Sequence, residues 1–226
     1  MENLANIPIF TKIYGIVVLS FGLLVSLKVV NPLYLIFLPQ AIFQGQIWRI
    51  FTAPFFLGKL DMNLIMRILS SFMMVKKLEE QHFSHRLSNL IFIFILLCIL
   101  TMSLSAIFGS FFVGSSVLSG LIYIYSKLYS NTMVNLMMVI PINVQWLPFT
   151  SLLIDLLNNM SMLPDLIGLA SGHIIFYLLF VLPVLIKRPL LKTPTFLSRL
   201  LDDTNFIPEG EQRNNAFGGR AHRVNE

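Results

Sequence analysis

Forty consecutive residues, from Leu87 to Ser126, contain no Asp, Glu, Lys, Arg or His. A helix needs roughly 20 mostly apolar residues to cross the hydrocarbon core of a bilayer. The stretch is therefore too long for a single crossing. Gly109 and Ser110 lie near its middle and supply residues that favour a turn. We expect two antiparallel membrane-spanning helices joined at this turn.

The composition of the whole chain supports a place in the membrane. Of its 226 residues, 56% are hydrophobic and 12% are charged, whereas a soluble domain carries about 25% charged residues. The net charge of +5 does not indicate a nucleic-acid partner, because the basic residues lie at the ends of apolar segments and in the polar tail. The single cysteine, Cys98, excludes an intramolecular disulfide and a cysteine-based zinc site. We expect neither a metal nor a cofactor.

Further apolar segments raise the expected number of spans to six. They cover residues 13–30, 62–75, the two halves of 87–126, 145–157 and 166–186. The fifth span has a possible upstream extension through VNLMMVIPINV. The side that holds both termini also holds most of the Lys and Arg residues near span ends, so the positive-inside rule predicts cytosolic termini. The fold class is an all-α polytopic membrane protein with six transmembrane helices.

The chain divides into two regions by composition. Residues 1–188 form the predicted membrane domain, whereas residues 189–226 are polar and contain several Pro, Gly and Asn. Such a segment cannot bury enough apolar surface to fold alone. We expect a cytosolic tail that is largely disordered.

The first loop, residues 32–60, combines apolar and polar residues in the stretch QGQIWRIFTAPFF. Irregular backbone at membrane depth is tolerated only where protein or a water-filled cavity covers it. We expect a half-buried interfacial element in which Trp48 lies at the headgroups and Arg49 extends towards the phosphates. From the physical pattern alone, both residues are interface anchors.

Several stretches resemble the derlin (Der1-like) family, in the same order along the chain. IFQGQIWRIFTAPFFLGKLDMNLIMRI is similar to its first loop, which carries a Gln-x-Trp-Arg element. The others are KKLEEQHF, LIYIYSKLY, WLPFTSLLIDLLNNMSMLPDLIGLASGHIIFY and LKTPTFL. Each match alone is weak, but together they run from about Ile7 to Leu197 and cover nearly the whole membrane region.

The resemblance implies a fold and a function. Derlins are rhomboid-like pseudoproteases of the endoplasmic reticulum membrane, so it implies a rhomboid-like bundle without enzymatic activity. It implies a role in ER-associated degradation, in the recognition and retrotranslocation of misfolded proteins for proteasomal degradation. The implied partners are ER membrane lipids, misfolded proteins, a ubiquitin ligase complex and an AAA+ unfoldase of the valosin-containing protein type. An organelle of endosymbiotic origin is the alternative location.

The resemblance also assigns roles to individual residues of the first loop. Gln46, Trp48 and Arg49 would engage lipid or substrate. We therefore expect a double variant, Trp48→Ala with Arg49→Ala, to impair extraction at unchanged protein abundance. The family opens laterally between spans two and five, and Arg67 and Asp155 would fit a thin or wet membrane there.

The main alternative is an active rhomboid-type intramembrane serine protease. Ser119 and His173 resemble its nucleophile and base, which such chemistry needs within hydrogen-bond reach of each other. However, Val117 replaces the first glycine of the rhomboid Gly-x-Ser-Gly pattern, and Phe176 replaces a glycine after the histidine. We expect Ser119 and His173 to be polar core residues. A solute channel or transporter is a third candidate, disfavoured because the chain shows no repeated halves.

Two glycines and two aspartates in the last spans also require interpretation. Gly168 and Gly172 form a Gly-x-x-x-Gly face, for which we expect close helix packing within the bundle.

An ionised Asp at a helix centre costs about 2.5–3.5 kcal/mol on insertion scales. We expect Asp165 to be interfacial, whereas Asp155 is either interfacial or faces a hydrated cavity.

The tail contains the stretch NNAFGGRAHRV, which resembles a degenerate SHP box near residues 216–224. In some derlins this box binds the unfoldase. The residues that would serve are Phe217, Gly218, Gly219, Arg223 and Val224. The glycine spacing departs from the family pattern, and an unstructured tail end is the alternative. Glycines would allow close backbone approach during extended docking.

Overall fold

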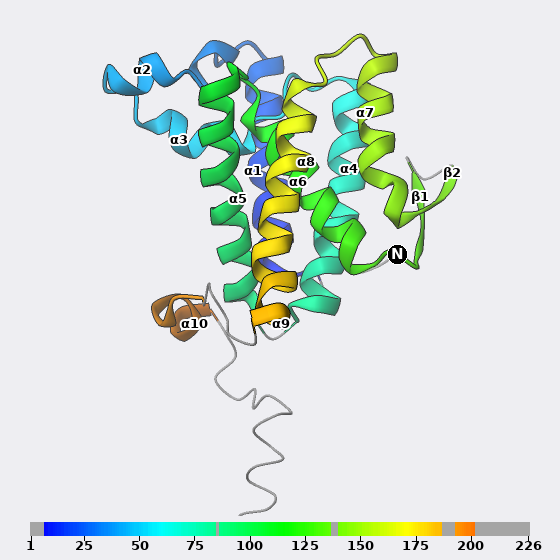
Figure 1. Ribbon diagram of the computed structural model, residues 1–226. Helices are drawn as coiled ribbons and strands as arrows, with labels where there is room; N and C mark the ends of the chain where they lie inside the picture. Colours follow the sequence, from blue (N-terminus) through cyan, green and yellow to red (C-terminus); the bar gives the residue numbers. More distant parts are fainter. Residues whose placement is uncertain (1–6, 85, 137–139, 187–192, 202–226) are drawn as a thin grey trace, which may run out of the picture.

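The computed structural model describes residues 7–84, 86–136, 140–186 and 193–201. Its long helices run up and down in one bundle (Figure 1). They are α1 (Ile9–Ser26), α4 (Met62–Lys77), α5 (Leu87–Phe108), α6 (Val113–Leu128), α7 (Leu147–Leu157) and α8 (Leu163–Phe176). The described part of the predicted membrane domain is therefore mainly helical, as the fold class requires.

Among the described residues, three helical segments are long and apolar enough to cross a membrane, by length and composition. These segments are Ile9–Ser26, Leu87–Phe108 and Leu163–Ile186. The last combines α8 with the π-helical segment η6 (Tyr177–Val181) and α9 (Leu182–Ile186). A shorter apolar helix covers Val144–Leu157. The chain is thus compatible with a multi-pass membrane protein, and the number of six spans stays a prediction.

The long uncharged stretch folds back at the expected position. Gly109 follows α5 directly and adopts the left-handed conformation, with φ of +73°. Glycine reaches this region without the steric penalty that other residues carry. The chain then enters α6, which packs antiparallel to α5 (Figure 1). The predicted turn is confirmed.

A β-hairpin replaces the expected upstream extension of the fifth span. Strands β1 (Met133–Leu136) and β2 (Ile140–Asn143) pair antiparallel, with Asn135 opposite Pro141. Pro141 has no backbone N–H and would break a helix here, whereas the valines and isoleucines favour extended structure. The extension through VNLMMVIPINV was therefore wrong. Helix α7 begins only at Leu147, with Pro148 in its first turn.

Helix α6 is the central element of the bundle. Every residue from Val113 to Leu121 is buried. A Cβ atom added to Gly168 of α8 would lie 2.2 Å from the carbonyl oxygen of Ser116, and one added to Gly172 would lie 2.7 Å from that of Gly120. The glycines therefore bring α8 into backbone contact with α6, inside one chain.

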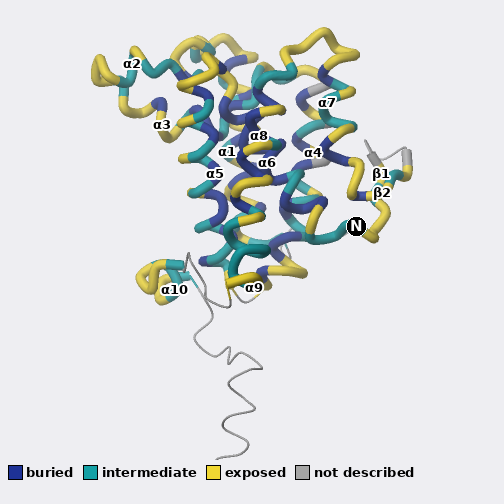
Figure 2. The backbone as a smooth tube through the Cα atoms, viewed as in Figure 1, coloured by how far each residue is buried: buried dark blue, intermediate teal, exposed yellow. Residues whose placement is uncertain are grey.

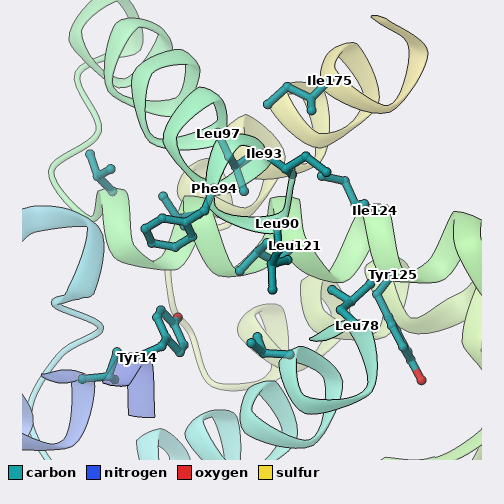
Figure 3. Close-up of a cluster of buried hydrophobic side chains, with 14 of the residues drawn as sticks. Tyr14, Leu78, Leu90, Ile93, Phe94, Leu97, Leu121, Ile124, Tyr125 and Ile175 are labelled. Carbon is teal, nitrogen blue, oxygen red and sulfur yellow. The ribbon is translucent and has the colours of Figure 1, made fainter. Parts of the chain in front are cut away.

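The apolar core surrounds α6. Figure 3 shows the side chains of α1, α5, α6 and α8 that form this core, among them Tyr14, Phe94, Leu121 and Ile175. Leu78 joins them from the π-helical segment η4 (Leu78–His82). The core therefore unites segments from both halves of the chain.

The first loop and the described part of the tail, residues 193–201, lie at opposite ends of the bundle (Figure 1). The loop contains the short helices α2 (Pro39–Phe43) and α3 (Trp48–Thr52), which lie at the end where α5 turns into α6 (Figure 1). Part of the predicted tail forms α10 (Thr195–Leu201), at the other end. There Thr193 donates a hydrogen bond of 2.6 Å to Asn89 of α5.

Candidate functional site

A half-buried arginine on α4 connects three other helices. Nη1 of Arg67 lies 3.0 Å from Oδ1 of Asp155 on α7, and Nη2 lies 3.3 Å from Oδ1 of Asp165 on α8. Nη2 also donates a hydrogen bond of 2.8 Å to the hydroxyl of Ser115 on α6. One guanidinium group thus joins α4 to three neighbouring helices.

Asp165 accepts most of the remaining hydrogen bonds of this group. Its Oδ1 accepts from the hydroxyl of Ser119 at 2.7 Å and from that of Ser115 at 3.3 Å. Its Oδ2 is buried and has no hydrogen-bond partner among the described residues. Below, Arg67, Ser115, Ser119, Asp155 and Asp165 together are called the Arg67 cluster.

Both aspartates are buried inside the helical bundle. Asp165 is fully buried and Asp155 is 3% exposed. Asp165 lies in the first turn of α8, and the small residues of α6 leave room for its carboxylate inside the bundle. Its interfacial depth in the membrane stays a prediction. Asp155 lies inside as well and pairs with Arg67. Buried charges persist where they are paired and hydrogen-bonded.

A cavity of about 510 Å³ leads from the first loop towards the Arg67 cluster. Arg67 and Ser115 form part of its lining, and Lys59 and Asp61 are its other charged residues. The rest is largely apolar and comes from the first loop, α4, the α5–α6 turn, the α7–α8 connection and the start of α8: Pro32, Leu33, Ile36, Phe56, Leu57, Gly58, Leu64, Phe112, Met160, Ser161 and Pro164. The cavity therefore combines apolar walls with a charged group in the bundle interior.

The neighbouring residues Trp48 and Arg49 of the first loop lie in different environments. Arg49 is 4% exposed. Its Nη1 donates to the carbonyl oxygens of Leu33 and, at 2.9 Å, Ile36, and its Nε donates to Gln46 at 2.7 Å. The expectation that Arg49 extends towards lipid phosphates was wrong, since the loop's own carbonyl groups surround it. Arg49 holds the first loop together.

Apolar side chains of the same loop remain exposed. Trp48 is 50% exposed, and Phe43, Ile47 and Phe51 are more exposed still. Figure 2 shows the exposed residues along α2 and α3 at one end of the bundle. This surface is suited to contact with lipid or with an apolar polypeptide.

The structure gives Ser119 and His173 different partners. Ser119 donates to Asp165, whereas Nδ1 of His173 lies 2.6 Å from the hydroxyl of Tyr123. Ser119 is fully buried, whereas His173 is exposed on α8. The expectation that His173 lies in the polar core was therefore wrong, because its ring remains accessible beside Tyr123. Among the described residues these two side chains form no nucleophile–base pair. The tail residues assigned to the SHP box, Phe217, Gly218, Gly219, Arg223 and Val224, lie outside the described residues.

Sequence reasoning singled out the members of the Arg67 cluster other than Ser115, but not their contacts. It noted Arg67, Asp155 and Ser119 separately, and it placed Asp165 at an interface. The sequence offered one clue to these contacts, since it places one basic and two acidic residues in apolar segments. Charged side chains are costly in lipid unless they pair with one another.

The fold and site define a class of protein. It is a helical membrane protein with a buried ion-pair cluster, an apolar first loop and no assembled serine–histidine pair among the described residues. The sequence profile of the Der1-like family matches residues 7–195. The chain therefore belongs to the Der1-like family, which confirms the resemblance inferred from its motifs.

Individual relatives agree with this family. The chain is 27% identical to Derlin-1.2 of Zea mays over 238 residues, which cover 100% of this chain and 98% of that protein. It is 28% identical to Derlin-1 of Oryza sativa subsp. japonica over 240 residues, with the same coverage. It is 30% identical to a probable derlin-2 homolog of Dictyostelium discoideum over 206 residues, or 87% of this chain and 81% of that protein.

Proposed function

We propose that the protein is a non-catalytic derlin of the endoplasmic reticulum membrane, with six spans and cytosolic termini. It acts in ER-associated degradation, where it helps to recognise misfolded proteins and to move them to the cytosol for proteasomal degradation. The observation that carries this proposal is the family match over residues 7–195. Its partners are ER lipids, misfolded clients, a ubiquitin ligase complex and an AAA+ unfoldase of the valosin-containing protein type.

The geometry supports extraction without covalent chemistry. A polypeptide that leaves the bilayer must exchange lipid for water, and its polar groups are costly in the hydrocarbon region. The exposed apolar side chains of the first loop, such as Trp48, offer contact to apolar segments. The cavity beside them offers apolar walls and the guanidinium group of Arg67. Together they provide an environment whose polarity is intermediate between that of lipid and that of water.

The arrangement of Ser119 supports the absence of catalysis. A serine nucleophile needs a base that takes its proton and a substrate that reaches its oxygen. The hydroxyl of Ser119 donates instead to Asp165, whose carboxylate is also bonded to Arg67. Since Ser119 is fully buried, a peptide bond has no access to it.

The test is the turnover of a misfolded, tagged membrane reporter in cells that lack their own derlins. The cells are complemented with the wild type, with Trp48→Ala or with Ser119→Ala. We expect the wild type to restore turnover without a cleaved reporter fragment, and Trp48→Ala to restore less. If the wild type leaves turnover unchanged, the proposal is wrong. A cleaved fragment that disappears with Ser119→Ala would establish the protease alternative.

A further inference from the structure

The Arg67 cluster contains more negative than positive charge. Within the described residues, Arg67 is the cation that pairs with both Asp155 and Asp165, at 3.0 and 3.3 Å. With both carboxyl groups ionised, the cluster has two negative charges for one positive charge. The surroundings are the apolar interior of the bundle, where unbalanced charge is costly. The cluster can therefore accept one further positive charge.

The hydrogen bonds of Asp165 leave room for one more donor. Its Oδ1 accepts from Ser115, Ser119 and Arg67, whereas its buried Oδ2 has no partner among the described residues. A buried carboxylate oxygen without a donor destabilises the protein, because it has lost its bonds to water. A second cation in the cluster would relieve this cost.

The cavity gives such a cation a route to the cluster. Arg67 lines the cavity, and its side chain is 18% exposed, whereas that of Asp165 is fully enclosed. Arg67 is therefore the member that an incoming group meets. If Arg67 stays paired with one aspartate and the incoming cation pairs with the other, two cations and two carboxylates form two ion pairs. An incoming anion would instead increase the excess of negative charge in the cluster.

The walls of the cavity indicate what carries the cation. Leu33, Ile36, Phe56 and Phe112 contribute apolar surface, which suits the apolar part of a membrane segment. Lys59 and Asp61 have opposite charges, so the rest of the lining that the structure describes adds no formal net charge. The complementary ligand is an apolar segment that contains one basic residue.

We propose that the Arg67 cluster binds a Lys or Arg side chain of an otherwise apolar client segment. A basic residue in a membrane segment that has lost its partner is unfavourable in lipid. Such a segment belongs to the class of misfolded membrane protein that an extraction factor meets. This inference rests on the proposed function and adds the class of substrate that the site prefers.

The test uses three reporters whose membrane segments differ at one central residue, which is Leu, Lys or Glu. Their turnover is measured in derlin-deficient cells that contain the wild type, Asp155→Asn or Glu80→Gln. Asp155→Asn removes one negative charge from the cluster with little change of shape. Glu80→Gln is the matched control, because Glu80 is exposed and pairs with Lys76, 3.8 Å away, outside the cavity lining.

We expect the wild type and Glu80→Gln to remove the Lys reporter several-fold faster than the Leu reporter, and the Glu reporter most slowly. Asp155→Asn should bring the ratio of Lys to Leu turnover close to one. Equal turnover of all three reporters by the wild type would overturn the inference and leave the proposed function intact. If the wild type turns over none of them, the proposed function itself fails.

A second measurement does not depend on the stability of the Asp155 variant. Ser161 lines the cavity, so Ser161→Cys is placed in a Cys98→Ala background of the full chain. A cysteine next to the central residue of each reporter then reports proximity through disulfide formation. We expect more cross-linking with the Lys reporter than with the Glu reporter. Equal cross-linking of the two would contradict the inference.

Discussion

At the scale of single residues, Arg49 changes the interpretation of the first loop. Its guanidinium group binds two backbone carbonyl groups and Gln46 inside the loop. We predict that Arg49→Ala destabilises the protein by on the order of 3 kcal/mol, because hydrogen bonds to a charged group are lost and buried acceptors remain unpaired. Thermal unfolding of the purified protein in detergent measures this loss.

Trp48→Ala is the control for this prediction. Trp48 is half exposed, so its removal should leave the unfolding temperature within a few degrees of the wild type while it lowers reporter turnover. We therefore expect the double variant of both residues to be less abundant than the wild type, which revises the unchanged abundance expected from the family resemblance. Equal unfolding temperatures for Arg49→Ala and Trp48→Ala would show that Arg49 has no structural role.

At the scale of elements, Glu79 joins the start of α1 to the segment after α4. Its carboxylate accepts from the backbone N–H groups of Phe10 and Thr11, at 2.9 and 2.8 Å, and from the Thr11 hydroxyl at 2.6 Å. The first N–H groups of a helix have no partner within the helix, and a negative charge there is favourable. Glu79 therefore caps α1 from a distant part of the chain.

We predict that Glu79→Ala destabilises the protein by about 2–3 kcal/mol, because both a helix cap and charged hydrogen bonds are lost. Amide hydrogen exchange should show faster exchange at Phe10 and Thr11 than in the wild type. Glu80→Gln is the control, since Glu80 is exposed. Unchanged exchange at Phe10 and Thr11 in Glu79→Ala would mean that another group caps α1.

The contact between α6 and α8 leads to a second prediction at this scale. Gly168→Ala places a Cβ atom 2.2 Å from the Ser116 carbonyl oxygen, so the two helix backbones must separate. We expect a loss of about 2–3 kcal/mol in unfolding free energy, at the upper end of overpacking effects. Ala170→Leu on the exposed face of α8 should be tolerated. Similar stabilities of the two variants would contradict a backbone contact.

At the scale of the whole molecule, an even number of spans places both ends of the chain on one side. We predict that tags at the two ends are both digested when protease is added outside sealed microsomes, and that a tag inserted between α7 and α8 is protected. The physical reason is the excess of Lys and Arg near the span ends on the predicted cytosolic side. Protection of only one end would require an odd number of spans.

The sequence predicts those features of the molecule that depend on local pattern. The return at Gly109 follows from the length of the uncharged stretch, and the family follows from motifs in order. The pairing of Arg67 with Asp165 depends on residues 98 positions apart, which no local pattern connects. Arg49 illustrates the same limit, because a buried arginine and an interfacial one have the same neighbours in sequence. The β-hairpin was not predicted, because the apolar composition around Pro141 suggested a helix. The effect of this proline on a helix outweighed that composition.

The cap on α1 also has a consequence for the order of biosynthesis. Thr11 and Glu79 are 68 residues apart. The N-terminal amides of α1 therefore have no access to this acceptor until the ribosome has translated α4 and the segment after it. Backbone groups without partners are costly in lipid. The cap on α1 therefore forms only after the segment that carries Glu79 has left the ribosome.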